Sequence, residues 1–91
     1  MLATCYVIQF GMEYELGRPQ QGDKFRSLFE KYMGEHNDIS VSHQMIGQAY
    51  SISAVYFFRK GQTAKAKKTI ETGLQYAPNN FELITRKKMI N

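Results

Sequence analysis

Two histidines and an aspartate lie close together near the middle of this chain. His36, Asp38 and His43 carry imidazole and carboxylate groups, which are common ligands of transition metals. Their spacing matches none of the usual ligand patterns, and a polar segment of this kind is typical of a connection between helices. The sequence therefore predicts no metal site.

The remaining reactive residues give no indication of catalysis. Cys5 lies in an apolar run, so we expect its thiol to be packed in the core and unreactive. Gly11, Gly17 and Gly22 lack the spacing and the lysine of a phosphate-binding loop. No arrangement of Ser, His and Asp, of Cys and His, or of paired carboxylates stands out, so we expect no enzyme activity and no cofactor.

Composition indicates one small folded domain. The chain has 91 residues, of which 43% are hydrophobic and 22% charged, and six Tyr and six Phe supply apolar surface for a core. Cys5 is the only cysteine, which excludes an internal disulfide and fits a reducing compartment. We therefore expect a cytoplasmic location. The apolar N-terminal stretch is too short to span a bilayer.

Positive charge is concentrated in the last third of the chain. The net charge is +4, yet the only charged side chains in residues 1–17 are those of Glu13 and Glu15. The basic residues that could form one face are Lys65, Lys67, Lys68, Arg86, Lys87 and Lys88. We interpret them as a solvated helix face, and keep weak nucleic-acid binding, with Tyr76 and Phe81 stacking on bases, as the less favoured alternative.

Residues 3–17 fit two secondary structures. Apolar residues alternate with polar ones from Tyr6 to Leu16, which is a strand pattern, whereas Ala3, Val7, Phe10 and Tyr14 form a helical stripe. We predict a helix, because the rest of the chain has helical periodicity and an isolated strand would have no partner.

The next two segments are separated by glycine and proline. Residues 17–23 are predicted to form a loop, and Asp23 is expected to cap a helix over residues 24–33. Gly34 is the expected stop of this helix, because glycine is common just past helix ends.

Three more helices are predicted in the second half. The first begins after Ser40 or Ser42 and ends near Lys60, the second covers residues 63–76, and the third covers residues 81–90 after Pro78. The buried side of the last helix is expected to include Phe81, Ile84 and either Met89 or the aliphatic stem of Lys88.

Residues 47–80 show the most regular spacing. Large and small residues recur at positions that face each other across two helices, with a glycine between the helices and a proline after them: Tyr50, Ala54, Phe57, Gly61, Ala66, Ile70, Gly73, Leu74 and Pro78. This pattern resembles one tetratricopeptide repeat, a helix–turn–helix unit of about 34 residues. Gly73 departs from the family, which usually has alanine there.

Residues 5–34 are similar to a degenerate earlier unit of the same kind. Gly17 corresponds to Gly61, with a longer loop after it. The other matches are Val7, Gly11 and Tyr14 to Tyr50, Ala54 and Phe57, and Phe25, Phe29 and Met33 to Ala66, Ile70 and Leu74. The resemblance implies an all-α domain over residues 1–91, a short TPR-like array of antiparallel hairpins with about five helices. Because Met1 opens into apolar sequence without a capping residue, we also expect a piece of a longer protein.

The same resemblance implies a binding function. In this family the first helix of each hairpin lines a groove for a partner, which here places Gln48, Ser51, Val55, Phe58 and Arg59 on the groove side. Phe58 would pack on a peptide and Arg59 would pair with a carboxylate, unless Phe58 instead packs under the N-terminal helix.

The family resemblance also limits the choice of partner. Gln48 and Ile52 stand where chaperone-binding members need Asn or Lys, so we expect no chaperone-tail clamp. The expected function is interaction with another protein or peptide. The alternative is a structural or oligomerisation segment of a larger protein, whose apolar N-terminal helix would be its contact surface. A homo-oligomer is a further alternative for the partner.

Overall fold

The computed structural model describes residues 2–36 and 41–90, which form five helices: α1 (Leu2–Glu15), α2 (Pro19–His36), α3 (His43–Arg59), α4 (Thr63–Tyr76) and α5 (Phe81–Ile90). These ranges contain no strand, so the all-α prediction is confirmed. The helix predicted over residues 3–17 is also confirmed, because Ala3, Val7, Phe10 and Tyr14 all face the core.

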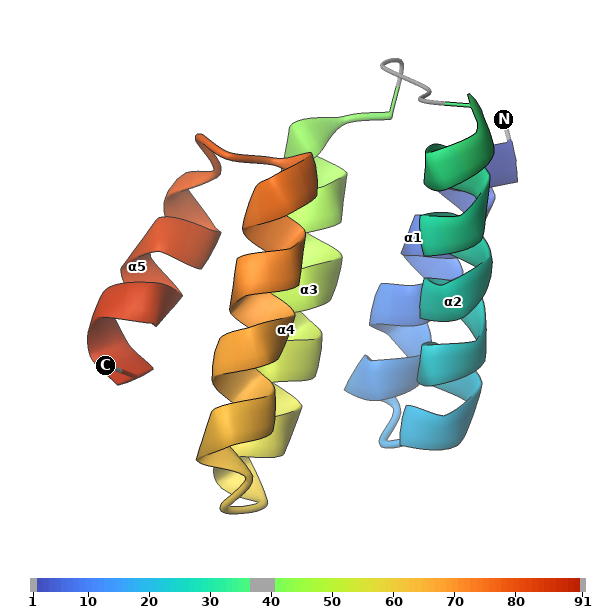
Figure 1. Cartoon of the computed structure of the whole chain (residues 1–91). Coiled ribbons are helices and arrows are strands. Elements are labelled where there is room, and N and C mark those ends of the chain that lie inside the picture. The colour runs from blue at the N-terminus through green and yellow to red at the C-terminus, as the bar shows by residue number, and fades with distance from the viewer. Residues whose placement is uncertain (1, 37–40, 91) are drawn as a thin grey trace.

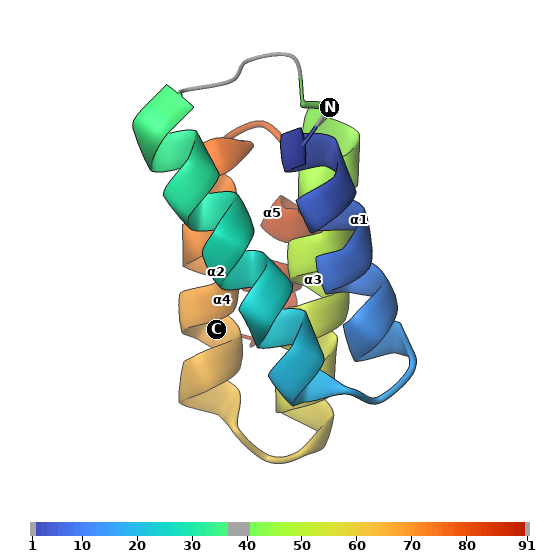
Figure 2. The ribbon, with the colours of Figure 1, turned by 90° about the vertical axis from the view of Figure 1, so that its right-hand side faces the viewer.

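The helices pack as antiparallel hairpins in two layers. Helices α1 and α2 form one hairpin, α3 and α4 form the next, and α5 lies against both α3 and α4 (Figure 1). In the two perpendicular views, α2 and α4 lie on one side of α1 and α3 (Figure 2). We call α1, α3 and α5 the inner layer and α2 and α4 the outer layer. No helix in the described ranges is both long enough and apolar enough to cross a membrane.

The same turn closes both hairpins. Gly17 and Gly61 have positive φ angles of 75° and 78°, which favour glycine because it has no Cβ. In each turn the residue after the glycine donates its N–H to the carbonyl five residues earlier, Arg18 to Glu13 at 2.7 Å and Gln62 to Phe57 at 2.9 Å. This is the Schellman arrangement that ends many helices.

The prediction of a loop over residues 17–23 is wrong. The prediction that this connection is longer than the one at Gly61 is also wrong, because residues 16–18 and residues 60–62 form connections of equal length. Helix α2 begins at Pro19, because a proline in the first helical turn needs no N–H donor there. Asp23 is therefore inside the helix and not its cap. Gly22 lies five residues beyond Gly17, as Ala66 lies five beyond Gly61, and a Cβ on Gly22 would stand 2.4 Å from the Tyr14 ring. Gly22, and not Phe25, thus occupies the close-approach position of the first hairpin.

The end of α2 differs from the prediction, and the start of α3 shows which of two predicted caps is used. Helix α2 continues through Gly34 to His36, so Gly34 does not end it. At the start of α3, the Ser42 side chain accepts the N–H of Met45 at 3.4 Å and forms the cap. Ser40, the other candidate cap, lies outside the described residues.

The rotation of α5 differs from the prediction. Ile84 is half-buried, but Lys88 is exposed. Leu83 is completely buried, whereas Phe81 is 80% exposed and Met89 67% exposed. Asn80 caps this helix: its side-chain oxygen accepts the Leu83 N–H at 3.0 Å and its amide donates to the His43 carbonyl at 3.2 Å. The cap fixes α5 on the end of α3, which turns Leu83 toward the core and Phe81 toward solvent.

Candidate functional site

The five residues predicted to line a groove do not lie in one depression. Ser51, Val55 and Arg59 line a hollow of about 510 Å³ between α1, α3 and α5. Gln48 lines a neighbouring depression of about 300 Å³ between α1 and α3, and Phe58, which is 49% exposed, lines neither. The exposure of Phe58 excludes the alternative that it packs under the N-terminal helix.

We call the larger depression the basic hollow. Three cationic side chains, Arg59, Lys60 and Arg86, line it together with the carboxylates of Glu15 and Glu82. Its apolar wall comes from α3 and the end of α1, through Ile52, Val55, Tyr56 and Tyr14. An anionic group with an apolar neighbour therefore matches the chemistry of this surface.

Ser51 supports the basic hollow from below. Its side chain is only 1% exposed, and its hydroxyl oxygen accepts the Nε–H of Arg86 at 3.3 Å. The bond links α3 to α5 across 35 positions of sequence and orients the Arg86 guanidinium. Ser51 thus acts through Arg86, whereas the sequence placed it on the groove surface.

We call the smaller depression the apolar groove. The α1 side consists of Val7, Ile8, Gly11, Met12, Glu15 and Leu16, and the α3 side consists of Met45, Gln48, Ala49 and Ile52. Glu15 and Ile52 also line the basic hollow, so the two depressions adjoin on the inner layer. Sequence reasoning missed this groove, although the spacing of Ile8, Met12 and Leu16 every fourth residue already indicated an apolar stripe on a helix.

The predicted basic face is divided between the two layers. Lys65 and Lys68 line a cavity of about 170 Å³ with α2, and the Lys65 ammonium lies 4.6 Å from the centre of the Phe57 ring. Lys67 on α4 and Lys87 and Lys88 on α5 are exposed. Arg86, in contrast, belongs to the basic hollow of the inner layer. The predicted basic residues therefore do not form a single surface: Lys65, Lys67, Lys68, Arg86, Lys87 and Lys88.

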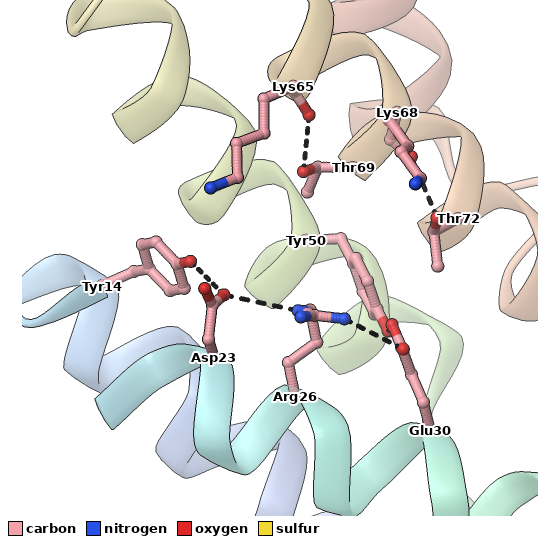
Figure 3. Close-up of polar contacts among 9 residues, drawn as sticks. All are labelled: Tyr14, Asp23, Arg26, Glu30, Tyr50, Lys65, Lys68, Thr69 and Thr72. Carbon is pink, nitrogen blue, oxygen red and sulfur yellow. Dashed lines mark hydrogen bonds and ion pairs between the residues drawn. The ribbon is translucent and has the colours of Figure 1, made fainter. Parts of the chain in front are cut away.

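A chain of polar contacts joins the two hairpins between the layers (Figure 3). Arg26 lies at its centre, with Nε 3.4 Å from Asp23 and a terminal nitrogen 3.0 Å from Glu30, all on α2. Tyr14 of α1 donates its hydroxyl to Asp23, and Tyr50 of α3 donates its hydroxyl to Glu30 at 2.7 Å. We call these five residues the polar clasp.

Three members of the clasp, Tyr14, Arg26 and Tyr50, have a raised pKa. Burial raises the pKa of Tyr50, and the neighbouring Glu30 carboxylate raises it further. Burial and the hydrogen bond to Asp23 likewise raise the pKa of Tyr14. Burial alone would lower the pKa of Arg26, but the carboxylates of Glu30 and Asp23 outweigh it and raise that pKa. All five groups are partnered within the clasp, which gives it a structural role.

The clasp was not predicted from the sequence. Asp23, Arg26 and Glu30 stand at i, i+3 and i+7, a spacing that puts opposite charges on one helix face. That pattern was the available signal. It could not show that a tyrosine from each of two other helices would meet the charges.

The other residues considered for chemistry are separate from these surfaces. In the described part of the chain no three His, Cys, Asp or Glu residues are placed to hold a metal ion. His36 and His43 lie at the end of α2 and the start of α3, and Asp38 is outside the described residues. Cys5 is exposed, so the prediction that its thiol is packed inside is wrong.

No family model, no curated protein and no solved structure matches this chain. The likeness to the tetratricopeptide family therefore stays a prediction from the spacing of its residues.

Proposed function

We propose that this protein is a TPR-like interaction module that binds a peptide segment of another protein at the basic hollow and catalyses no reaction. The observation that carries the proposal is the grouping of Arg59, Lys60 and Arg86 around one depression of the inner layer. The expected resemblance points to the same layer, because the first helix of a hairpin lines the groove in that family.

The chemistry of the hollow indicates the kind of peptide. A carboxylate side chain would accept hydrogen bonds from a guanidinium, and two parallel bonds give both strength and orientation. Ser51 already holds one N–H of Arg86, so this guanidinium is pre-oriented for such a contact. An apolar residue beside the acidic one would pack on Val55 and Ile52.

A nucleic acid fits the arrangement less well. A phosphate backbone needs cationic side chains along a continuous path, whereas Lys65 and Lys68 lie in the outer-layer cavity and Arg86 in the inner layer. A cytoplasmic location is part of the proposal, because an exposed lone thiol at Cys5 is best preserved in a reducing compartment.

A peptide-display selection against the immobilised protein tests the function. Recovered peptides should share an acidic residue next to an apolar one, and a labelled representative should bind in a fluorescence-anisotropy titration. Arg59→Glu should raise its dissociation constant by about tenfold or more, because a like charge replaces the pairing charge.

The matched control is Lys67→Glu, which makes the same change of charge at an exposed site on α4. It should change the dissociation constant less than about twofold, as expected of a charge outside the contact. Equal losses in the two variants would show that only the overall charge attracts the peptide, and the proposed site would then be wrong.

A further inference from the structure

The apolar groove lacks a cover on the side away from the core. Ile8, Met12 and Leu16 are 39%, 52% and 61% exposed and follow one another at every fourth residue, the first two in α1 and Leu16 directly after its end. Gly11 and Ala49 lie in the floor, where the two helices approach closely: a Cβ added at Gly11 would be 3.3 Å from Ala49. The stripe from Ile8 to Leu16 is about 12 Å long at the rise of an α-helix.

A second apolar stripe lies on α5. Phe81 and Met89 are the most exposed of the large hydrophobic residues, at 80% and 67%. They are eight positions apart, which is about 12 Å along the helix and about 80° around it, with the half-buried Ile84 and Thr85 between them. The opposite face of α5 is held to its own chain by Leu83, which is completely buried.

The two stripes have opposite charges beside them. Helix α1 carries two carboxylates and no lysine or arginine: Glu13 is paired with Arg18 at 3.4 Å, whereas Glu15 is exposed and lines the groove. Helix α5 carries Lys87 and Lys88 in its last turn, both exposed. A helix lying in the groove with Phe81 and Met89 downward would bring ammonium groups near Glu15, a favourable pairing at the rim.

The positions of the stripes prevent them from meeting within one molecule. Helix α3 lies between α1 and α5, which are at opposite ends of the inner layer (Figure 1). The two surfaces are similar in length, both are apolar, and their neighbouring charges are opposite. A second copy of the chain can therefore place its α5 on the apolar groove of the first.

We propose that α5 of one molecule docks into the apolar groove of a second molecule, head to tail. The inference goes beyond the proposed peptide binding and does not depend on it. Because the contact joins two different surfaces, a dimer keeps one free groove and one free α5, and further copies can add unless a ring closes.

Sedimentation velocity over a wide range of protein concentrations tests the docking. The wild-type mean mass should rise above the monomer mass of 10.5 kDa as the concentration increases. Met12→Glu puts a charge in the groove, and Phe81→Glu puts one on α5. Each should remain monomeric, because burying an unpaired carboxylate in an apolar contact is costly.

Mixing the two variants gives the sharpest result. The Met12→Glu molecule still has an intact α5, and the Phe81→Glu molecule still has an intact groove. An equimolar mixture can therefore make one contact and should form a heterodimer of twice the monomer mass and nothing larger. Circular dichroism and melting of each variant verify that both changes leave the fold intact, as expected at exposed positions.

Leu2→Glu is the matched control, because Leu2 is on the same helix, is 51% exposed and does not line the groove. It should associate as the wild type does, and so should Arg59→Glu, which tests the peptide site separately. A wild-type protein that stays monomeric at millimolar concentration would overturn the docking. So would a mixture that forms no heterodimer, or a Leu2→Glu variant that is as monomeric as Met12→Glu.

Discussion

The two outer helices attach to the inner layer by different kinds of contact. Helix α2 has 18 residues but completely buries only Gly22 and Phe29, whereas α4 has 14 residues and buries Ala66, Ile70 and Gly73. Helix α2 instead carries the three charged members of the polar clasp, whose side chains are between 25% and 37% exposed.

The difference shows how one hairpin architecture can be held in two ways. In the second hairpin, small residues allow close approach and the contact is mostly hydrophobic burial, which depends little on pH or salt. In the first hairpin, hydrogen bonds to partly buried charges supply part of the attachment, and these depend on protonation. The two hairpins should therefore respond differently to the same perturbations.

The largest effect is expected from removing apolar volume in the second hairpin. Ile70 on α4 is 1% exposed, so Ile70→Ala should lower the free energy of unfolding by about 2–5 kcal/mol. Urea denaturation at several salt concentrations measures the loss, which should be the same at low and high salt. A loss that varies with salt would contradict the apolar description of this hairpin.

Alkaline pH should act mainly through the polar clasp, which attaches α2 to α1 through Tyr14 and to α3 through Tyr50. The raised pKa values of Tyr14 and Tyr50 mean that the folded protein keeps these protons where the unfolded chain, with an ordinary tyrosine pKa of about 10, loses them. Their contribution to stability is complete below about pH 10 and falls above it by about 1.4 kcal/mol per pH unit for each tyrosine.

Urea denaturation between about pH 9 and pH 11 measures this slope, for the tyrosine range given by the ordinary pKa. The variant with both Tyr14→Phe and Tyr50→Phe is the control, and it should have the shallower slope whatever its stability at neutral pH. Equal slopes would show that the clasp does not hold the tyrosines in their neutral form.

Replacing Gly73 by alanine should have a smaller effect, and it should lower the free energy of unfolding. Glycine to alanine in a helix normally stabilises, but a Cβ at Gly73 would be 2.8 Å from the Cβ of Tyr50 and 2.9 Å from Leu83. Gly73→Ala should therefore cost about 1–3 kcal/mol through overpacking, measured by thermal or urea unfolding. A stabilised variant would mean that α4 and α3 are less closely packed than the structure has them.

The smallest effect is the opposite response of a glycine on α2. Gly34 is exposed within the helix and has no atom within 4 Å of an added Cβ. Gly34→Ala should raise the free energy of unfolding by about 0.5–1 kcal/mol, because alanine loses less backbone entropy in a helix. The same urea assay measures it. A neutral or negative result would place the end of α2 before Gly34, as the sequence alone suggested.

The sequence by itself determined the five helices and the pairing of the second hairpin. Apolar periodicity depends only on 3.6 residues per turn, and the glycine at a helix end acts through its own backbone, so both can be interpreted without knowledge of distant residues. Proline at the start of α2 was misjudged, because the same residue ends a helix or begins one depending on its place in the turn.

Only the tertiary structure decided which exposed surfaces exist. The Asn80 cap and its bond to the His43 carbonyl fix the rotation of α5, and this rotation exposes Phe81 and buries Leu83. Ser51 became a support for Arg86, and Tyr14 and Tyr50 met the charges of α2, because helices distant in sequence were brought together. Local periodicity gives a helix its apolar stripe, but contacts between helices choose which part of that stripe is covered.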